Sequence, residues 1–374
     1  MKITILVSRL TGGGAERVAS LWANGFIERG HDVSIVVSTK NKKDTTYPLS
    51  PNIKIYSIGS SFFQPKIRAV INKFMYLLKS RQKHLSDVLH KINPDVVIAV
   101  LYPWDWDAYM VTRDMDVKII NTEHNSFEFP DYLPMKPNLK KDKFENNKLY
   151  DHVTVLTNVD KELLGDSYSN VTVLPNPLTF TPVDDVPVKE KTILATGRFD
   201  AWFGKGFDVL IKAFARICKQ HPDWCLKIAG SGQKENLIYL QKIAEKEEIP
   251  DSQIQFLGFC NDIQSVYNKS SIFVLSSRHE GFGMVLTEAM SQGCACISCD
   301  YKGRQSEIIT NASQGIICPV ADIDALAEAM ETMITDDDYR AKCQKNAIEC
   351  SKRYSMEKTM DRWDEIFRKL GLMS

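Results

Sequence analysis

Two series of alternating strand and helix patterns, separated by a proline-rich interruption, constrain the fold of this chain more than any other feature. In the first series, short runs of aliphatic and β-branched residues predict strands and amphipathic stretches predict helices. The expected strands are 2–8, 32–38, 53–58, 95–100, 117–121, 152–156 and 171–174, and the expected helices are 16–29, 66–92 and 138–150. Such alternation is typical of a parallel sheet with helices on both faces.

The second series follows an irregular segment at 175–187 that contains four prolines and is expected to link two domains. Its expected strands are 192–196, 225–229, 253–256, 271–275 and 295–298, and its expected helices are 207–220, 234–247, 323–335, 338–353 and 356–370. A chain of 374 residues exceeds the usual size of one hydrophobic core. We therefore predict two α/β domains.

Composition argues against several functional classes. Basic and acidic residues both number 47, so the formal charge is zero and gives no support for nucleic-acid binding. No apolar run reaches the ~18 residues of a membrane-spanning helix, and the first seven residues are expected to form a strand rather than a secretory signal. The nine cysteines are expected to be reduced in a cytoplasm. Cys294, Cys296 and Cys299 are expected in a buried strand rather than a metal site.

The most informative local pattern runs from Glu280 to Glu288 and begins Glu-Gly-Phe-Gly. It directly follows the expected strand 271–275, and the apolar positions after Gly283 predict a helix. Glu280 is therefore expected at the carboxyl end of a strand, where open α/β sheets bind ligands. Free backbone amides at the helix start suit an anionic group such as phosphate. Glu288, further along the helix, is expected within reach of a ribose or sugar hydroxyl.

Two basic residues accompany glycines in a second motif. Gly197-Arg198 follows an expected strand, and Lys205-Gly206 opens the next helix. A forked guanidinium and a compact ammonium are both suited to binding an anionic group such as a diphosphate. A carboxylate pair beside such cations fits a diphosphate better than the acid and nucleophile of a glycosidase.

A third motif, Gly12-Gly13-Gly14-Ala-Glu16-Arg17, joins the first strand to the first helix. Its glycines allow the backbone to approach a ligand closely and leave helix-start amides free. The spacing is not that of a nicotinamide-dinucleotide loop. Glu16 and Arg17 either face a ligand or anchor the helix, and both roles stay open.

Together these motifs resemble those of retaining GT-B glycosyltransferases, and in particular the Gly-Gly-Ala-Glu-Arg subgroup of glycosyltransferase family four. The resemblance covers essentially the whole chain and is strongest over 197–300. It implies an α/β protein with the GT-B fold, in which two Rossmann-like domains face each other across a cleft. The implied parts are an acceptor-binding domain over 1–178, a nucleotide-sugar-binding domain over 179–355 and a C-terminal helix over 356–374 that crosses back to the first domain.

The resemblance also implies roles for individual residues. Arg198 and Lys205 would grip the diphosphate, Glu288 the ribose, Glu280 the transferred sugar, and His124 would lie beside that sugar in the first domain. The neighbouring Glu123 is expected to point elsewhere. The expected catalytic residues are His124, Glu280, Arg198 and Lys205, and the expected donor-binding residues are Gly13, Gly14, Arg198, Lys205, Glu280, Gly281, Phe282, Gly283, Met284, Val285 and Glu288. The implied reaction retains the anomeric configuration and needs no metal, other cofactor or covalent protein nucleophile.

A basic amphipathic stretch at 60–84 contains no acidic residue. The pattern suits either a helix packed on a sheet or a helix lying on an anionic membrane surface. Lys66, Arg68 and Lys73 are the expected membrane or acceptor contacts. A second basic cluster, expected to extend that surface or to meet acceptor phosphates, comprises Lys136, Lys140, Lys141 and Lys143.

We therefore predict a hexosyltransferase that moves a sugar from a nucleotide sugar to a saccharide or lipid-linked saccharide in surface polysaccharide or glycan biosynthesis. UDP is the nucleotide favoured by family frequency. The protein is expected to be a cytoplasmic monomer, peripheral to the inner face of the cytoplasmic membrane, with no nucleic-acid partner. Two alternatives stay open: a soluble synthase of the same fold with a small acceptor, and a catalytically silent nucleotide-sugar-binding subunit.

Overall fold

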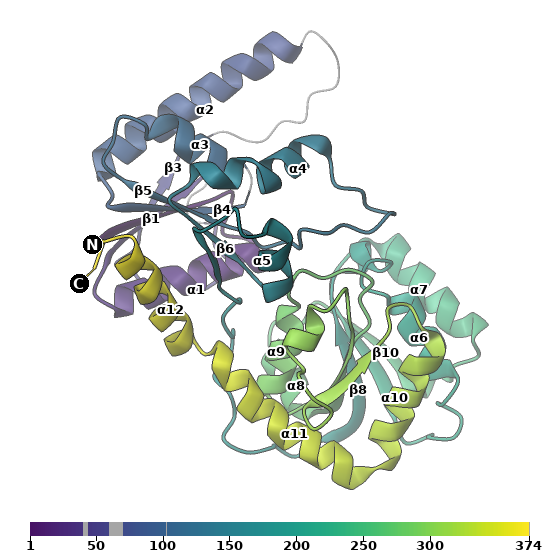
Figure 1. Cartoon of the computed structure of the whole chain (residues 1–374). Coiled ribbons are helices and arrows are strands. Elements are labelled where there is room, and N and C mark those ends of the chain that lie inside the picture. The colour runs from purple at the N-terminus through teal and green to yellow at the C-terminus, as the bar shows by residue number, and fades with distance from the viewer. Residues whose placement is uncertain (40–43, 60–69, 102, 374) are drawn as a thin grey trace. The chain divides into compact units, whose positions relative to one another are not determined.

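The computed structural model describes residues 1–39, 44–59, 70–101 and 103–373, with side chains for all of these except 70–80, 138, 139, 141 and 142. The chain forms two compact α/β units (Figure 1). The first comprises residues 1–177 together with 356–374, and the second comprises residues 178–355.

The first unit is built on a seven-stranded parallel sheet with the order β3-β2-β1-β4-β5-β6-β7. Its strands are β1 Lys2–Val7, β2 Asp32–Val37, β3 Lys54–Ser57, β4 Val96–Val100, β5 Lys118–Thr122, β6 His152–Val155 and β7 Val171–Val173. β1 is hydrogen-bonded to β2 on one side and to β4 on the other. The chain therefore winds outward in both directions from β1 and β4, as in Rossmann-like folds.

Helices join most of these strands, and such crossover connections let neighbouring strands run parallel. They are α1 Gly14–Glu28, α2 Val70–Ile92, α3 Trp104–Val111, α4 Pro137–Phe144 and α5 Asn158–Leu164, with a 3₁₀ turn η1 at Asn146–Leu149. One core of this unit joins α2 and α3 to the sheet through Leu85, Leu89, Trp104, Val97 and Ala99.

The final helix, α12 Met356–Lys369, packs within the first unit against α1. Trp363 is fully buried, and its ring meets Trp22 of α1 edge-on with centroids 5.1 Å apart. At the end of α1, Arg29 donates to Asp364 at 2.7 Å and to Asp361 at 2.8 Å. Apolar burial and two ion pairs therefore attach the last fourteen-residue helix to the first unit.

The second unit contains a six-stranded parallel sheet with the order β10-β9-β8-β11-β12-β13. Its strands are β8 Glu190–Thr196, β9 Cys225–Ala229, β10 Ile254–Gly258, β11 Ser270–Leu275, β12 Ala295–Cys299 and β13 Gly315–Cys318. Its helices are α6 Phe207–Ala215, α7 Lys234–Lys246, α8 Ile263–Lys269, α9 Met284–Ser291, α10 Ile323–Thr335 and α11 Asp337–Ser351, with 3₁₀ turns η2 Phe199–Ala201, η3 Asp251–Gln253, η4 Gln305–Glu307 and η5 Lys352–Tyr354.

The predicted α/β class with two Rossmann-like sheets is confirmed, and several element boundaries differ. The helix expected over 207–220 ends at Ala215 because the backbone continues in tighter turns, with Ile217 N bonded to Phe214 O at 3.1 Å. The helix expected over 138–150 divides into α4 and η1. The elements α3, α5, α8 and β13 were not predicted.

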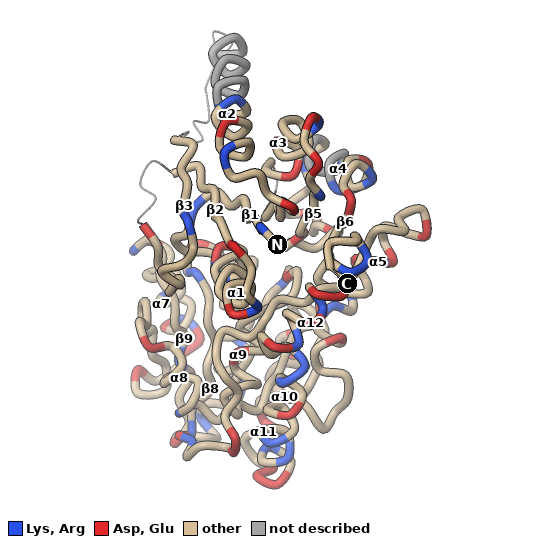
Figure 2. Tube along the Cα trace, turned by 90° about the vertical axis from the view of Figure 1, so that its left-hand side faces the viewer, with Lys and Arg blue, Asp and Glu red and all other residues tan. Residues whose placement is uncertain are grey.

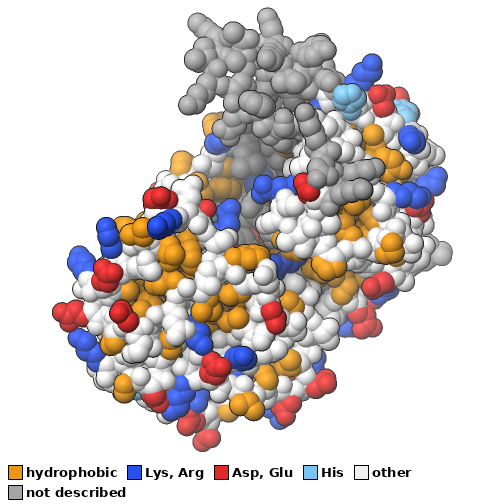
Figure 3. Space-filling view, turned by 180° about the vertical axis from the view of Figure 1, so that it is seen from behind, with side chains coloured by type: hydrophobic (Ala, Val, Ile, Leu, Met, Phe, Trp, Pro, Cys, Tyr) orange, Lys and Arg blue, Asp and Glu red, His pale blue; other side chains and the backbone are white. Residues whose placement is uncertain are grey.

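Charged side chains of both signs are interspersed over the face seen in Figure 3, in keeping with the zero net charge. The part of α2 whose side chains the structure describes also carries both signs, among them Arg81, Lys83 and Asp87. Basic and acidic segments follow each other along this helix in Figure 2. Within the part of the chain that the structure describes, no helix combines the length and apolarity needed to cross a membrane.

Candidate functional site

The loops after β8 and β11 meet at the centre of the second sheet. These two strands are paired in parallel, although three helices and two strands separate them along the chain. Their carboxyl ends lead into the loops 197–206 and 276–283, and the winding direction changes between them. In open α/β sheets this switch point is where ligands bind. The sequence motifs that were predicted to bind the donor therefore fall at the edge of the sheet best suited to it.

A glycine joins the two loops at their closest approach. Gly206 begins α6 with a left-handed φ of 65°, and a Cβ atom there would lie 1.9 Å from the carbonyl oxygen of Ser276. Ser276 Oγ donates to Lys205 O at 2.9 Å, and Arg278 N donates to Gly204 O at 2.8 Å. Only glycine fits between these backbones, so the loop bearing Lys205 is fixed against the loop bearing Glu280.

Lys205 and Glu280 are brought together by this arrangement. The Lys205 ammonium forms an ion pair with Oε1 of Glu280, which also accepts a hydrogen bond from Ser277 Oγ at 2.9 Å. The Lys205 side chain is 26% exposed and that of Glu280 is 14% exposed, so the pair is accessible from solvent. A cation and a carboxylate are therefore held side by side where a ligand can reach both.

Arg278 was missed by sequence reasoning, and it clamps the same two loops. It donates two hydrogen bonds to the Asp208 carboxylate, at 2.6 and 2.7 Å, and a third to Phe203 O at 2.6 Å. Its guanidinium also lies 4.1 Å from the centre of the Phe203 ring. A bidentate pair of this kind fixes geometry as well as charge. The available signal was a basic residue two positions before Glu280, which does not identify its partner.

Arg198 lies exposed in the loop after β8. The same loop is anchored by Asp200, which accepts from Gln233 N at 2.7 Å and from Asn236 Nδ2 at 2.9 Å. The backbone hydrogen bond from Gln233, then the one from Asn236, lower the pKa of Asp200. Gly230 allows the next loop to approach, because a Cβ there would lie 1.7 Å from Gly197 O. The backbone around Arg198 is therefore fixed while its side chain faces solvent.

Glu288 lies on α9 in a buried hydrogen-bond network rather than beside Glu280. Its side chain is 2% exposed, Thr179 Oγ1 donates to Oε1 at 2.7 Å, and Tyr267 OH donates to Oε2 at 3.2 Å. Burial, with the nearby Glu288 charge, raises the pKa of Tyr267 well above its ordinary value. Thr196 Oγ1 lies 3.2 Å from the same tyrosine oxygen. Both carboxylate oxygens of Glu288 are therefore held by hydroxyl donors within the second unit.

The residues between the two glutamates present backbone rather than side chains. Gly283 precedes α9 with φ 89°, and Phe282 is 4% exposed with its ring 5.4 Å from Tyr354. Gly281, Met284 and Val285 are half-buried. His279, which precedes Glu280, packs edge-on against Tyr301 at 4.8 Å. The Phe282 side chain therefore packs in the core, and Gly283 turns the chain into α9.

In the first unit, His124 follows β5 and rests on Trp22, with ring centroids 5.4 Å apart. Its Nε2 lies 3.2 Å from Thr122 Oγ1. Because the Thr122 hydroxyl donates its one proton to Ala99 O at 2.9 Å, it accepts from His124, which is therefore protonated on Nε2.

Burial lowers the pKa of His124 to about 4; Asn176 opposes this shift and the Lys143 ammonium adds to it. The imidazole is therefore neutral at pH 7. A neutral ring with a protonated Nε2 can act through hydrogen bonds but does not supply a positive charge.

The glycine-rich loop at residues 12–14 lies beside the carboxylate of Glu16. Gly13 precedes α1 with φ 73°, and a Cβ there would lie 2.0 Å from Glu16 Oε2. Arg9 pairs with Glu16 at 3.3 Å, and Tyr47 OH donates to Gly13 O at 2.9 Å. Gly14 is the exposed first residue of α1. The Glu16 carboxylate therefore lies against the turn that begins α1, and of its two open roles the anchoring of this helix is the one the geometry favours.

The second basic cluster is not a continuous surface. Lys136 and Lys140 are exposed, but Lys143 is 1% exposed and paired with Glu123 at 2.5 Å, so its predicted place on a membrane or acceptor surface is wrong. The Lys141 side chain lies outside the described residues, as do Lys66, Arg68 and the Lys73 side chain.

Cys294, Cys296 and Cys299 lie in or next to β12 and are buried, with Cys294 Sγ 3.2 Å from Tyr267 O. Burial raises the pKa of the Cys294 and Cys299 thiols to about 11. No three His, Cys, Asp or Glu side chains gather as a metal site would require within the described ranges.

Two family models match the chain in succession. Residues 12–179 match the model described as Glycosyltransferase Family 4, and residues 180–349 match the model described as Glycosyl transferases group 1. Two solved structures share the fold. Sucrose-phosphate synthase from Thermosynechococcus elongatus has a TM-score of 0.81 at 19% identity, covering 99% of this chain and 98% of that one. S. aureus TarM, in complex with fondaparinux, alpha-GlcNAc-glycerol and UDP, has a TM-score of 0.79 at 14% identity, covering 98% and 99%.

Two relatives align with nearly the whole chain. An uncharacterized glycosyltransferase of Haemophilus influenzae is 27% identical over 363 residues, which cover 95% of this chain and 96% of the relative. The Campylobacter jejuni GalNAc-alpha-(1->4)-GalNAc-alpha-(1->3)-diNAcBac-PP-undecaprenol alpha-1,4-N-acetyl-D-galactosaminyltransferase is 26% identical over 373 residues, which cover 97% of each.

Two Rossmann-like units with parallel sheets, matched over their whole length by such structures, define an α/β protein with the GT-B fold. The chain belongs to the glycosyltransferases of the family-four type. The predicted family and fold are thereby confirmed, while its assignment to the Gly-Gly-Ala-Glu-Arg subgroup stays a prediction.

The close approach at Gly206 can be tested against a second glycine of similar conformation. Gly258→Ala has φ 68° and open space around the added Cβ, so it is expected to cost about 1–2 kcal/mol of unfolding free energy for the left-handed backbone alone. Gly206→Ala adds the clash with Ser276 O and is expected to cost at least about 2 kcal/mol more. Urea denaturation of the two variants measures the difference, and equal losses would show that the loops are not held this tightly.

Proposed function

We propose that the protein is a retaining, metal-independent hexosyltransferase that uses a UDP-sugar and extends a saccharide or lipid-linked saccharide. The observation that carries this proposal is the accessible Lys205–Glu280 pair, fixed at the switch point of the second sheet next to the start of α9. A cation, a carboxylate and helix-start amides in one place match the three needs of a nucleotide-sugar donor: a charged diphosphate, sugar hydroxyls and a developing negative charge.

The roles in the reaction follow from charge and exposure. Lys205 and Arg198 stabilise the diphosphate as the glycosidic bond breaks, and the amides at the start of α9 add to them. Glu280 accepts hydrogen bonds from the transferred sugar. Glu288 takes the ribose hydroxyls in place of Thr179. No protein nucleophile is assigned, so the acceptor attacks on the face that the leaving phosphate departs from, and that phosphate accepts the acceptor's proton.

The donor and acceptor are assigned from the relatives. TarM is a structural neighbour whose complex contains UDP, and the Campylobacter relative is named for a PP-undecaprenol acceptor. An acceptor of that kind supports a location at the cytoplasmic face of a membrane. The stretch 60–84, with nine apolar positions among its basic residues, is the segment whose composition suits such a surface.

Thermal-shift measurements test the donor. UDP at about a hundred times its Kd is expected to stabilise the protein by about 2.7 kcal/mol, with a smaller shift from GDP or ADP. EDTA is expected to leave the UDP shift unchanged, since cationic side chains and helix-start amides carry the diphosphate. A shift abolished by EDTA would contradict metal independence, and no shift with any nucleotide would favour a silent subunit.

Substitutions at the ion pair test the site. Glu280→Gln is expected to abolish transfer with the melting temperature nearly unchanged, because it removes a charge that faces the sugar. Lys205→Ala is expected to raise the barrier by about 2–4 kcal/mol, as expected for the loss of one preorganised donor. Lys227→Ala is the control, since Lys227 also pairs with a glutamate, Glu190 at 3.0 Å, but away from the switch point. Near-normal turnover in both site variants would refute the assignment.

Flotation with anionic phospholipid vesicles tests the acceptor class. Changing Lys66, Arg68 and Lys73 to Gln together is expected to weaken binding by up to about a hundredfold, since each cation near such a surface contributes about 1 kcal/mol. The control changes three exposed lysines of the second unit, Lys219, Lys242 and Lys246, and is expected to leave binding unchanged. If the unmodified protein does not float, the soluble synthase with a small acceptor becomes the better interpretation.

A further inference from the structure

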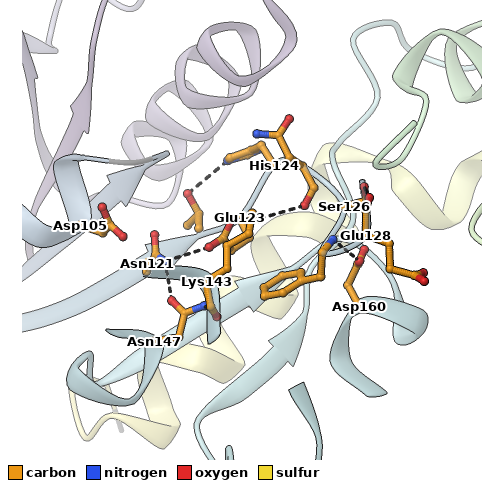
Figure 4. A network of polar contacts seen from close by, with 12 residues as sticks. Asp105, Asn121, Glu123, His124, Ser126, Glu128, Lys143, Asn147 and Asp160 are labelled. Atoms are coloured by element: carbon orange, nitrogen blue, oxygen red, sulfur yellow. Dashed lines mark hydrogen bonds and ion pairs between the residues drawn. The ribbon is translucent and has the colours of Figure 1, made fainter. Parts of the chain in front are cut away.

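A buried lysine lies beneath the segment that carries His124. Lys143, on α4, is 1% exposed, which is unusual for a lysine unless its charge is paired. Its Nζ atom lies 2.5 Å from Glu123 Oε2 and 3.4 Å from Asn125 O, and 4.2 Å from the centre of the Phe127 ring (Figure 4). One ammonium therefore contacts residues 123, 125 and 127, which are every second residue of the segment after β5.

This alternation determines which way His124 faces. Side chains of an extended segment point alternately to opposite sides. Glu123 continues β5, since its N–H donates to Thr154 O of β6 at 2.9 Å, so the side chains of Glu123 and His124 point to opposite sides. With Glu123 held by Lys143, His124 is directed to the other side, where it meets Trp22 and Thr122. The ion pair therefore acts on the histidine through the backbone, without contacting its ring.

The remaining polar groups of this region fix the lysine and the ends of the segment. Asn121 donates to Asn147 Oδ1 at 2.7 Å, and Asn147 donates to Lys143 O at 2.9 Å, which anchors α4 to β5. Glu123 N donates to Thr154 O of β6 at 2.9 Å. Phe127 N donates to the buried Asp160 carboxylate at 2.9 Å.

We propose that Lys143 and Glu123 are positioning residues, which hold the segment after β5 so that His124 is presented in one orientation to the ligand. Burying an ion pair costs desolvation free energy, and apolar residues of similar volume often stabilise a fold equally well. It is an effective means of fixing one register of a short segment. The link from His124 to turnover rests on the proposed function, and the anchoring itself does not.

The NMR titration of the His124 ring tests the anchoring in the full chain without any ligand. Lys143→Met keeps the side-chain length and removes the charge. The pKa of His124 is about 4, lowered by burial and by Lys143. Removing the ammonium takes away a positive charge that disfavours the protonated ring, and water entering the segment lessens the burial of the ring. Both changes raise the pKa of His124, which is expected to move from about 4 to about 5 or higher, toward its ordinary value. An unchanged titration curve would overturn the proposal.

Two further variants separate positioning from general loss of stability. Arg81→Met breaks another buried ion pair of the first unit, Arg81–Asp107 between α2 and α3, and is expected to lower the melting temperature without moving the His124 titration. The double variant Lys143→Met with Glu123→Gln removes both charges and is expected to recover stability while the titration stays shifted. A His124 pKa that returns to about 4 in the double variant would show that charge balance, not anchoring, sets it, and would overturn the proposal.

UDP release from UDP-glucose or UDP-N-acetylglucosamine then separates this proposal from the proposed function. Lys143→Met is expected to slow release by at least about tenfold, since a small misplacement of a contacting group is costly, while Arg81→Met is expected to leave it unchanged. A shifted titration with unaltered release would leave the anchoring in place and refute the role of His124 beside the transferred sugar.

Discussion

The parallel pairing of β8 with β11 is the constraint on which the candidate site depends. Because parallel strands end at the same edge of a sheet, the pairing brings together loops that are about 80 residues apart along the chain. Both loops must then pass each other closely, and Gly206 is the position where their backbones touch. The ion pair of Lys205 with Glu280 and the Arg278–Asp208 pair are consequences of that approach.

Both of these ion pairs use residues whose sequence positions gave no indication of pairing. The glycines and charged residues of the motifs were visible in the sequence because their types and spacing are unusual. Their roles toward a donor were inferred from resemblance, and these roles stay predictions. Lys205 and Glu280 were each expected to bind ligand, and the structure adds that they contact each other. Such a pair is formed by tertiary packing, which local periodicity does not encode.

The difference between local sequence pattern and tertiary packing also explains which elements could be predicted from the sequence. Long buried strands such as β1 and β4 show continuous apolar runs, and α1 shows two turns or more of helical period, so their existence followed from pattern alone. The short helices α3 and α5 have too few residues to show a period. Lys143 was assigned to the surface because basic residues are usually exposed. Its burial depends on Glu123, 20 residues earlier, and on the fold that brings them together.

The Lys205–Glu280 and Lys143–Glu123 ion pairs differ in burial, and this difference determines which role each pair can have. The Lys205–Glu280 side chains are 26% and 14% exposed, so water or a ligand can compete for either partner at little cost. The Lys143–Glu123 side chains are 1% and 8% exposed, and loss of either partner would leave a charge without compensation, which typically costs about 3–5 kcal/mol. An exchangeable pair suits direct contact with a ligand whose own charges replace one partner. A permanent pair suits the fixed support of a neighbouring group, and His124 is the group that lies next to it in the chain.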